Sequence, residues 1–197
     1  AEHRAARTGP LSAAERRAFR LFAGVLVLGG AIMALVSVHL LTLLQARGVA
    51  LASAVSYAAL IGPAQVGARI VEMSFEGRHH PLWTLTAALG LVALGLVLLA
   101  LRLPGVGIWL VLYGGGNGIY SIARGTVPLA LFGPVRYPLV VGRLARPGLV
   151  AQALAPPAGA FVLTQASPEA LLWLLLALSL ANLGLVGALW HLHRAER

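Results

Sequence analysis

The sequence predicts an all-α membrane protein with six transmembrane helices. Of its 197 residues, 59% are apolar and only 11% are charged, whereas a soluble domain usually carries about a quarter charged residues. The apolar residues gather in six runs, each close to the roughly 20 residues that a helix needs to cross a bilayer. The runs lack the two-residue alternation of membrane strands. These observations exclude a soluble enzyme, a disordered chain and, because cysteine is absent from the sequence, a disulfide-stabilised secreted protein.

The limits of the apolar runs give the spans. We expect them at Leu21–Leu44, Val49–Met73, Leu82–Leu101, Val106–Ala123, Leu149–Ala166 and Ala170–Trp190. A cytoplasmic linker then covers residues 1–20, a helical bundle covers 21–193, and a cytoplasmic tail covers 194–197. The long connection Arg124–Gly148 is rich in proline and arginine. It is interpreted either as a surface segment with a short interfacial helix at Tyr137–Ala145 or as a basic tether.

The arginines give the orientation. All fifteen basic residues are arginine, and twelve of them lie in segments on the side of the two termini. Only Arg47 and Arg102 lie in segments on the other side. Because cytoplasmic segments of membrane proteins are enriched in basic residues, both termini are expected in the cytoplasm, with the chain in the cytoplasmic (inner) membrane of a bacterium. The net charge of +9 therefore reflects topology, and nucleic acid is not an expected partner.

The six spans form a faint repeat of two triplets. The second span of each triplet contains proline near its middle, at Gly62-Pro63 in one and at Pro156-Pro157 in the other. Proline kinks a helix, and interrupted spans at corresponding positions are typical of the moving parts of a transporter. The alternative is that proline is simply common in membrane helices. The third span of each triplet is leucine-rich and uncharged, so we expect it to face lipid.

Local motifs accompany this repeat. They are the segment from Gly62-Pro63-Ala64-Gln65 to Gly77-Arg78, the run Gly114–Gly118, and Arg124-Gly125-Thr126 with Phe132-Gly133-Pro134. Together with the three-plus-three spans and the basic segment that leads in, they resemble the C-terminal half of a major facilitator superfamily (MFS) transporter, over nearly the whole chain. The family's loop signature normally includes an aspartate, which Gly77-Arg78-His79-His80 lacks, so the gate of that motif is not carried over in full.

The resemblance implies an MFS-like half bundle that acts in secondary active transport. A small solute would cross the membrane by alternating access, as proton-coupled efflux, without enzyme activity, cofactor or metal. The implied partners are the lipid bilayer, a small-molecule or ion substrate, protons, and an N-terminal six-span half, either upstream in the same chain or in a second subunit. The alternative is a non-catalytic six-span membrane subunit or assembly factor.

Polar residues inside the spans are the candidate site, because a charge at the bilayer centre costs about 2.5–3.5 kcal/mol on insertion scales. Arg69 and Glu72 are three residues apart and share a helix face. They either form a cytoplasmic gate, together with Glu76 and Arg78, or neutralise each other at a helix end. His39 is the only histidine within a span; it either couples protons or reaches water at the outer end.

The resemblance adds a set of cavity-lining residues, because the first and fourth spans of each half line the cavity in the family. The set consists of His39, Tyr113, Asn117 and Tyr120, and Gln65 is a further candidate for hydrogen bonding to substrate. Gln152 and Asn182 are equally well interpreted as interhelical hydrogen bonds. Gly114 and Gly118 have the four-residue spacing that favours close helix packing.

Overall fold

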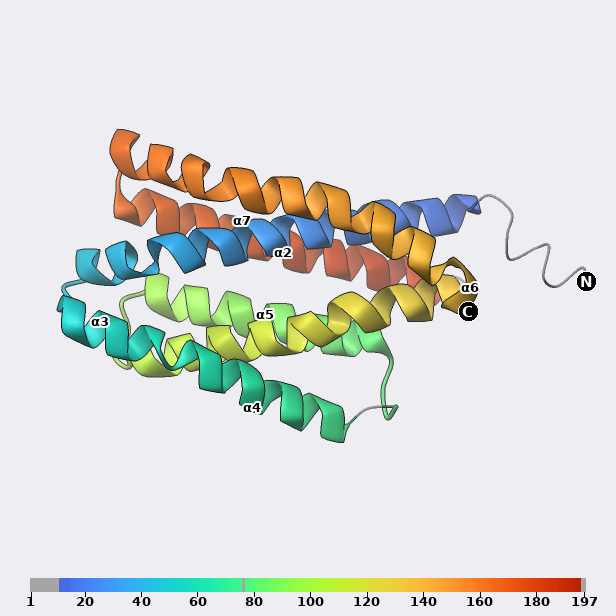
Figure 1. The fold of residues 1–197 in the computed structure, drawn as a ribbon, viewed down its shortest axis with the longest axis horizontal. Helices are drawn as coiled ribbons and strands as arrows, with labels where there is room; N and C mark the ends of the chain where they lie inside the picture. The colour runs from blue at the N-terminus through green and yellow to red at the C-terminus, as the bar shows by residue number, and fades with distance from the viewer. Residues whose placement is uncertain (1–10, 76, 196–197) are drawn as a thin grey trace, which may run out of the picture.

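The computed structural model describes residues 11–75 and 77–195, and within these residues all of the regular secondary structure is helix, joined by short turns. The helices are α2 (Ala13–Ala46), α3 (Leu51–Ala58), α4 (Ile61–Ser74), α5 (Pro81–Ala100), α6 (Val106–Gln165) and α7 (Pro168–Ala195). In this part of the chain, five helices are long and apolar enough to cross a membrane when α3 and α4 are counted together. The protein is therefore an integral membrane helical bundle (Figure 1).

The helix ends gather at the two ends of the bundle. Near the end of α7, Trp190 Nε1 donates to Thr86 Oγ1 near the start of α5 at 2.9 Å. At the other end, Arg102 after α5 lies 3.4 Å from Glu169 at the start of α7. Figure 1 shows the start of α2 and the end of α4 at the same end of the bundle as the end of α7. We call this the basic end, and the other the opposite end.

Helix α6 reverses its direction in the middle. Sixty residues of straight helix would be about 90 Å long, three times the roughly 30 Å hydrocarbon core. Gly133, however, has φ 71° and ψ 167°, which glycine adopts without steric cost. Pro134 follows in the first turn of the next stretch, where its missing N–H breaks no helical bond. The first arm (106–132) and the second arm (134–165) run in opposite directions from this point at the basic end (Figure 1).

This reversal corrects the expected connection over Arg124–Gly148. The segment is helical on both sides of Gly133, so it forms neither a separate interfacial helix at Tyr137–Ala145 nor a tether. The fourth and fifth predicted spans both lie inside α6, and five helices stand where six separate spans were expected. Proline and arginine are loop signals, but buried residues recur every four positions in the second arm, as on one face of a helix: Val140, Leu144 and Gly148.

The two predicted proline kinks have different outcomes. The second predicted span is broken at Ala59 and Leu60, just before Gly62-Pro63. The position follows from the proline ring, which clashes with the carbonyl of the residue four positions earlier, here Ala59. Pro156-Pro157 lies in a stretch of α6 that continues without a break. The backbone angles of Ala59 and Leu60 are also right-handed helical, so the second span is interrupted without a change to a non-helical backbone conformation.

Glycines bring the first arm of α6 close to its neighbours. This arm packs against α2, α4 and α5. A Cβ placed on Gly116 would lie 2.6 Å from a backbone oxygen of α5, and one on Gly114 would lie 2.9 Å from a backbone oxygen of α4. Gly118 meets the backbone of Gln65 on α4 more closely still. The interpretation of Gly114 and Gly118 as a close-packing pair is therefore confirmed.

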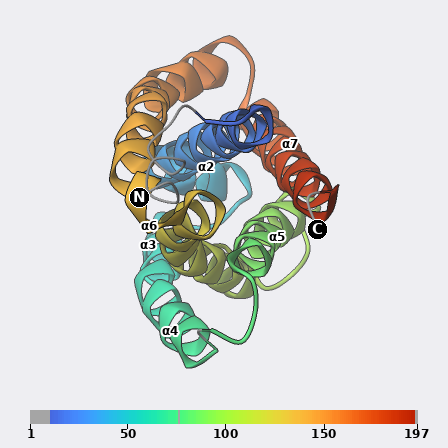
Figure 2. The same cartoon turned by 90° about the vertical axis from the view of Figure 1, so that its right-hand side faces the viewer.

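The bundle has two different faces. Seen along its axis, α4 and the second arm of α6 stand at the edges of one face, with α2 and the first arm between them (Figure 2). We call this the front face; α5 and α7 lie behind it. The expectation that α5 faces lipid is wrong for most of its surface, because α6 and α7 cover it and 56% of its apolar stretch is buried.

Gly118→Ala tests the close packing. The added methyl group would meet the backbone of Gln65, which cannot move aside, so α4 and α6 must separate. We expect a loss of about 1–3 kcal/mol in the free energy of unfolding, measured as a lower Tm in detergent. The matched control is Gly67→Ala on α4, where nothing lies within 4 Å of the added atom. A G118A variant that melts with the wild type would contradict the close packing.

Candidate functional site

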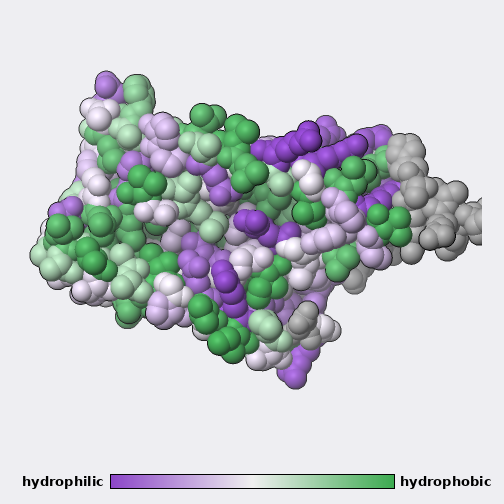
Figure 3. Space-filling model, in the orientation of Figure 1, coloured by the Kyte–Doolittle hydropathy of each residue, from purple (hydrophilic) through white to green (hydrophobic). Residues whose placement is uncertain are grey.

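Polar side chains gather on the front face, from its middle toward the basic end. They come from three elements and are not fully buried: Gln65 and Arg69 on α4, Ser121 and Arg124 on the first arm of α6, and Gln152 on the second arm. Figure 3 shows hydrophilic side chains at mid-length on this face, between apolar ones. Because such groups are costly against lipid and usually mark functional pathways in membrane proteins, this cluster is the candidate site.

Arg69 reaches from α4 across to the first arm of α6. Its Nε lies 3.4 Å from the carbonyl oxygen of Gly118, and Ser121 Oγ donates to the same oxygen at 2.7 Å. Gly118 stands 12 residues after the start of α6, about 18 Å along the helix and near the middle of the hydrocarbon core. Helical side chains lean toward the start of their own helix. Since α4 runs toward the basic end, the side chain of Arg69 leans the other way, toward the middle of the bundle.

Glu72 contacts Thr84 and His79 and does not pair with Arg69. Its Oε1 accepts a hydrogen bond from Thr84 Oγ1 on α5 at 2.6 Å and lies 3.1 Å from Nε2 of His79, between α4 and α5. The same nitrogen lies 3.0 Å from Thr84 Oγ1. The Glu72 cluster, defined as Glu72, His79 and Thr84, thereby ties the end of α4 to the start of α5 beside a cavity of about 300 Å³.

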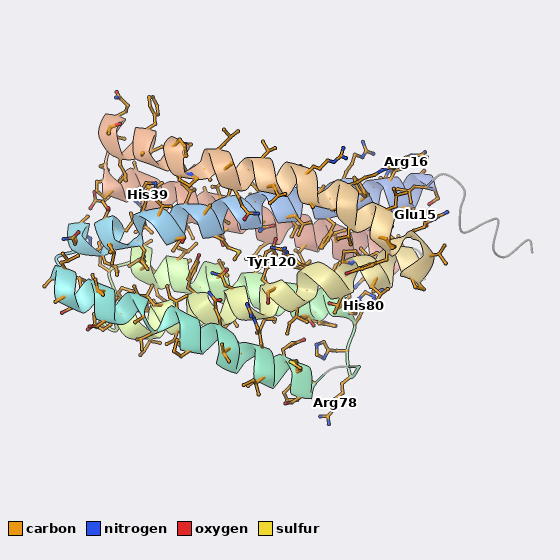
Figure 4. All side chains as sticks on the ribbon, in the orientation of Figure 1. Glu15, Arg16, His39, Arg78, His80 and Tyr120 are labelled. Carbon is orange, nitrogen blue, oxygen red and sulfur yellow. The ribbon has the colours of Figure 1, made fainter. Side chains whose placement is uncertain are left out.

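The other predicted gate residues stand apart from this cluster. Glu76 lies outside the described residues. The guanidinium carbon of Arg78 is 5.6 Å from the centre of the Phe75 ring, and Figure 4 shows Arg78 at the margin of the basic end, pointing away from the bundle. Within residues 11–75 and 77–195, the basic partner of Glu72 is His79 and not Arg69 or Arg78.

His39 is a buried contact between two helices. Its side chain is 7% exposed, and its Nε2 lies 3.1 Å from the carbonyl oxygen of Pro156 on the second arm of α6. The ring covers Gly159, where a Cβ would come within 2.7 Å of it. Figure 4 shows His39 toward the opposite end, away from Tyr120 in the middle of the bundle. The structure thus gives His39 a packing partner, and its part in proton coupling stays a prediction.

The remaining predicted lining residues do not all border one cavity. Tyr113 and Asn117, one turn apart on the first arm, are buried inside the bundle. Gln65 is half-buried on α4, and its backbone packs on the first arm. Tyr120 is also buried, and its hydroxyl donates to the carbonyl oxygen of Val25 on α2 at 3.3 Å. Of the four, only Tyr120 borders the cavity on the front face that is described next.

A cavity of about 320 Å³ lies between α2 and the two arms of α6. We call it the arm pocket. Most of its lining is apolar, and its polar side chains are Tyr120, Ser121, Arg124, Tyr137 and Gln152. Sequence reasoning missed Ser121, Arg124 and Tyr137, because the pocket forms only when the second arm folds back at Gly133. One signal was present: Tyr120 and Arg124 are four residues apart and share a helix face.

Thr84→Val tests the Glu72 cluster. The substitution removes the hydroxyl that donates to Glu72 while keeping the shape of the side chain, so the end of α4 should open more often. Hydrogen bonds to charged groups contribute about 1.5–3 kcal/mol. Because the chain has no native cysteine, a single cysteine at Ile122, which lines the adjacent cavity, can report opening. We expect a water-soluble maleimide to label it about tenfold faster.

The control for this measurement is Thr164→Val, because that hydroxyl bonds only within its own helix, to Phe161 at 2.9 Å. It should leave the labelling rate unchanged. Equal rates for Thr84→Val and the parent would show that the cluster does not hold α4 in place.

No model of a protein family matches the chain, and neither a curated protein nor a solved structure is detectably similar to it. The functional conclusion therefore depends on the residues of the chain itself.

Proposed function

We propose that this chain is one half of a secondary active transporter, similar to the major facilitator superfamily, that moves a small solute by alternating access. The observation that carries the proposal is the polar front face. Arg69, Ser121 and Arg124 lie on this face of a largely apolar bundle. Against lipid such groups would cost several kcal/mol, but against a water-filled cavity they cost little. The exposed side chains of α7 from Trp173 to Ala188, in contrast, are all apolar or small and suit lipid.

The course of α6 supports six membrane crossings arranged as three plus three. The first arm has 27 residues and the second has 32, and each exceeds the roughly 20 residues that one crossing needs. With α2, α3–α4, α5 and α7, the crossings number six, and the start of α2 and the end of α7 lie on one side. The arginines favour the cytoplasm for the basic end, which is the side expected for the termini in a bacterial inner membrane.

The front face would be one wall of the transport cavity. A second six-span half, in the same chain or in another subunit, would supply the other wall. The Glu72 cluster suits a gate at the basic end, because its separation releases α4, the helix that carries Arg69. The break at Ala59 and Leu60 would serve as the hinge. A proton on Glu72 would remove its charge and weaken the tie, which offers a route to proton-coupled efflux.

Single cysteines along α6 test the crossings. We expect cysteine at Leu103 and at Gln165, just before and at the end of α6, to react only with reagent outside the cell. Cysteine at Val135, beside the reversal, should react only from the cytoplasm. All three positions are exposed, and these 197 residues contribute no background labelling because they contain no cysteine. Reaction of Leu103→Cys and Gln165→Cys from opposite sides would contradict the six crossings.

Cysteine at Ser121 tests the cavity itself. Ser121 is exposed on the front face, and Leu180, at a similar depth in α7, is exposed on the lipid-facing side. A charged, water-soluble thiol reagent should modify Ser121→Cys and leave Leu180→Cys unmodified, because thiolate forms only where water reaches. Because the proposed transport is coupled to protons, a pH gradient across the membrane should change the rate at which the reagent modifies Ser121→Cys. If both cysteines are inert, the front face is covered, and a non-catalytic subunit becomes the better explanation.

A further inference from the structure

The arm pocket contains a positive charge without a matching negative one. Arg124 is its only charged lining residue. The described residues include three carboxylates, and each has a basic partner elsewhere: Glu15 lies against Arg136, Glu72 against His79, and Glu169 against Arg102. In the described part of the chain, therefore, no carboxylate neutralises Arg124.

Hydrogen-bond donors surround the same space. The guanidinium of Arg124 offers five N–H groups in a planar fork that suits a carboxylate or another oxyanion. Gln152 donates one N–H to the carbonyl oxygen of Gly148, at 3.3 Å within its own helix, and has a second N–H to offer. Tyr137 lines the pocket from the second arm with its hydroxyl toward Gly125 on the first arm. Donors thus come from both arms of α6.

The rest of the lining is apolar and comes mostly from α2 and the second arm, including Leu26, Val141, Leu144 and Leu149, with Gly125 and Pro128 from the first arm. The volume of about 320 Å³ lies at the lower end of the range for small-molecule pockets, about 300–1,000 Å³. A charged fork next to an apolar wall fits a ligand that joins an anionic group to a compact apolar body.

We propose that the arm pocket binds a small amphipathic organic anion, with its anionic oxygens on Arg124 and its apolar body against α2 and the second arm. If the chain is the transporter half proposed above, this anion is the class of solute that it carries. An anionic phospholipid has the same chemistry, with a phosphate in place of the solute's anionic group. The pocket opens on the front face, which the transport proposal turns away from lipid, and this favours the solute.

Binding of 2-naphthoate tests the site. The probe combines one carboxylate with an apolar ring system, and its neutral analogue 2-naphthamide has the same shape without the charge. Affinities are measured by calorimetry on the full-length protein in phosphatidylcholine nanodiscs, with empty nanodiscs subtracted. We expect 2-naphthoate to bind more tightly than 2-naphthamide, and Arg124→Gln to weaken 2-naphthoate binding about tenfold or more while leaving 2-naphthamide unchanged.

Two further variants separate the site from general effects. Arg143→Gln removes the same charge from an exposed position of α6 outside the pocket, and it should leave binding unchanged. Arg124→Lys keeps the charge but loses the fork, so it should fall between wild type and Arg124→Gln. Unchanged 2-naphthamide binding by Arg124→Gln shows that its loss of 2-naphthoate binding is not a failure to fold.

The outcomes distinguish the alternatives. Equal 2-naphthoate binding by wild type and Arg124→Gln, or no binding by wild type, overturns the anion site. Displacement of 2-naphthoate when phosphatidylglycerol is added to the nanodiscs overturns the solute and assigns the pocket to a lipid. Arg124-dependent binding in a protein whose Ser121→Cys is inert would leave the anion site standing and reject transport. Labelling of Ser121→Cys without Arg124-dependent binding would leave the transport proposal standing and reject the anion site.

Discussion

The contact between the backbones of α4 and the first arm of α6 determines where the polar groups of this protein lie. Gly114 and Gly118 leave no side chain between the two helices, and Gly118 meets Gln65 directly. Only at this separation can Arg69 on α4 reach the carbonyl oxygen of Gly118, which already accepts from Ser121. Lipid offers no hydrophobic drive to pack helices, so membrane helices depend on close packing, which small residues permit. The position of the arginine therefore depends on the glycines.

The reversal at Gly133 is the second constraint, because it returns the second arm of α6 to α2. Arg136, three residues after the reversal, pairs with Glu15 at the start of α2, and Phe132 packs edge-on against Phe19. These contacts fix the angle between the arms at the basic end. The arm pocket occupies the space that the angle leaves, so a substitution at the reversal would alter the pocket without touching its lining.

The apolar runs predict the membrane helices, and the spacing of Gly114 and Gly118 predicts their close packing, because both depend on composition or on local periodicity. The segment 124–148 is mispredicted, since four prolines outweigh a buried stripe at helical spacing. The partners of Arg69 and Glu72 are beyond sequence reasoning for a different reason. Spacing of three residues indicates a shared face, but the choice between a neighbour and a group on another helix depends on packing, as Thr84 and Gly118 show.

The charge balance of the described residues bears on what the front face meets. Every described carboxylate already has a basic partner, so Arg69 and Arg124 keep their charges without one. An arginine held in lipid would need a counter-ion or water at considerable cost, and a backbone carbonyl at 3.4 Å from Arg69 compensates only part of it. The remainder must come from groups other than these described carboxylates. Water in a cavity, an anionic ligand and acidic residues of a second half would each supply it, and the first and the last of these require the front face to lie away from lipid.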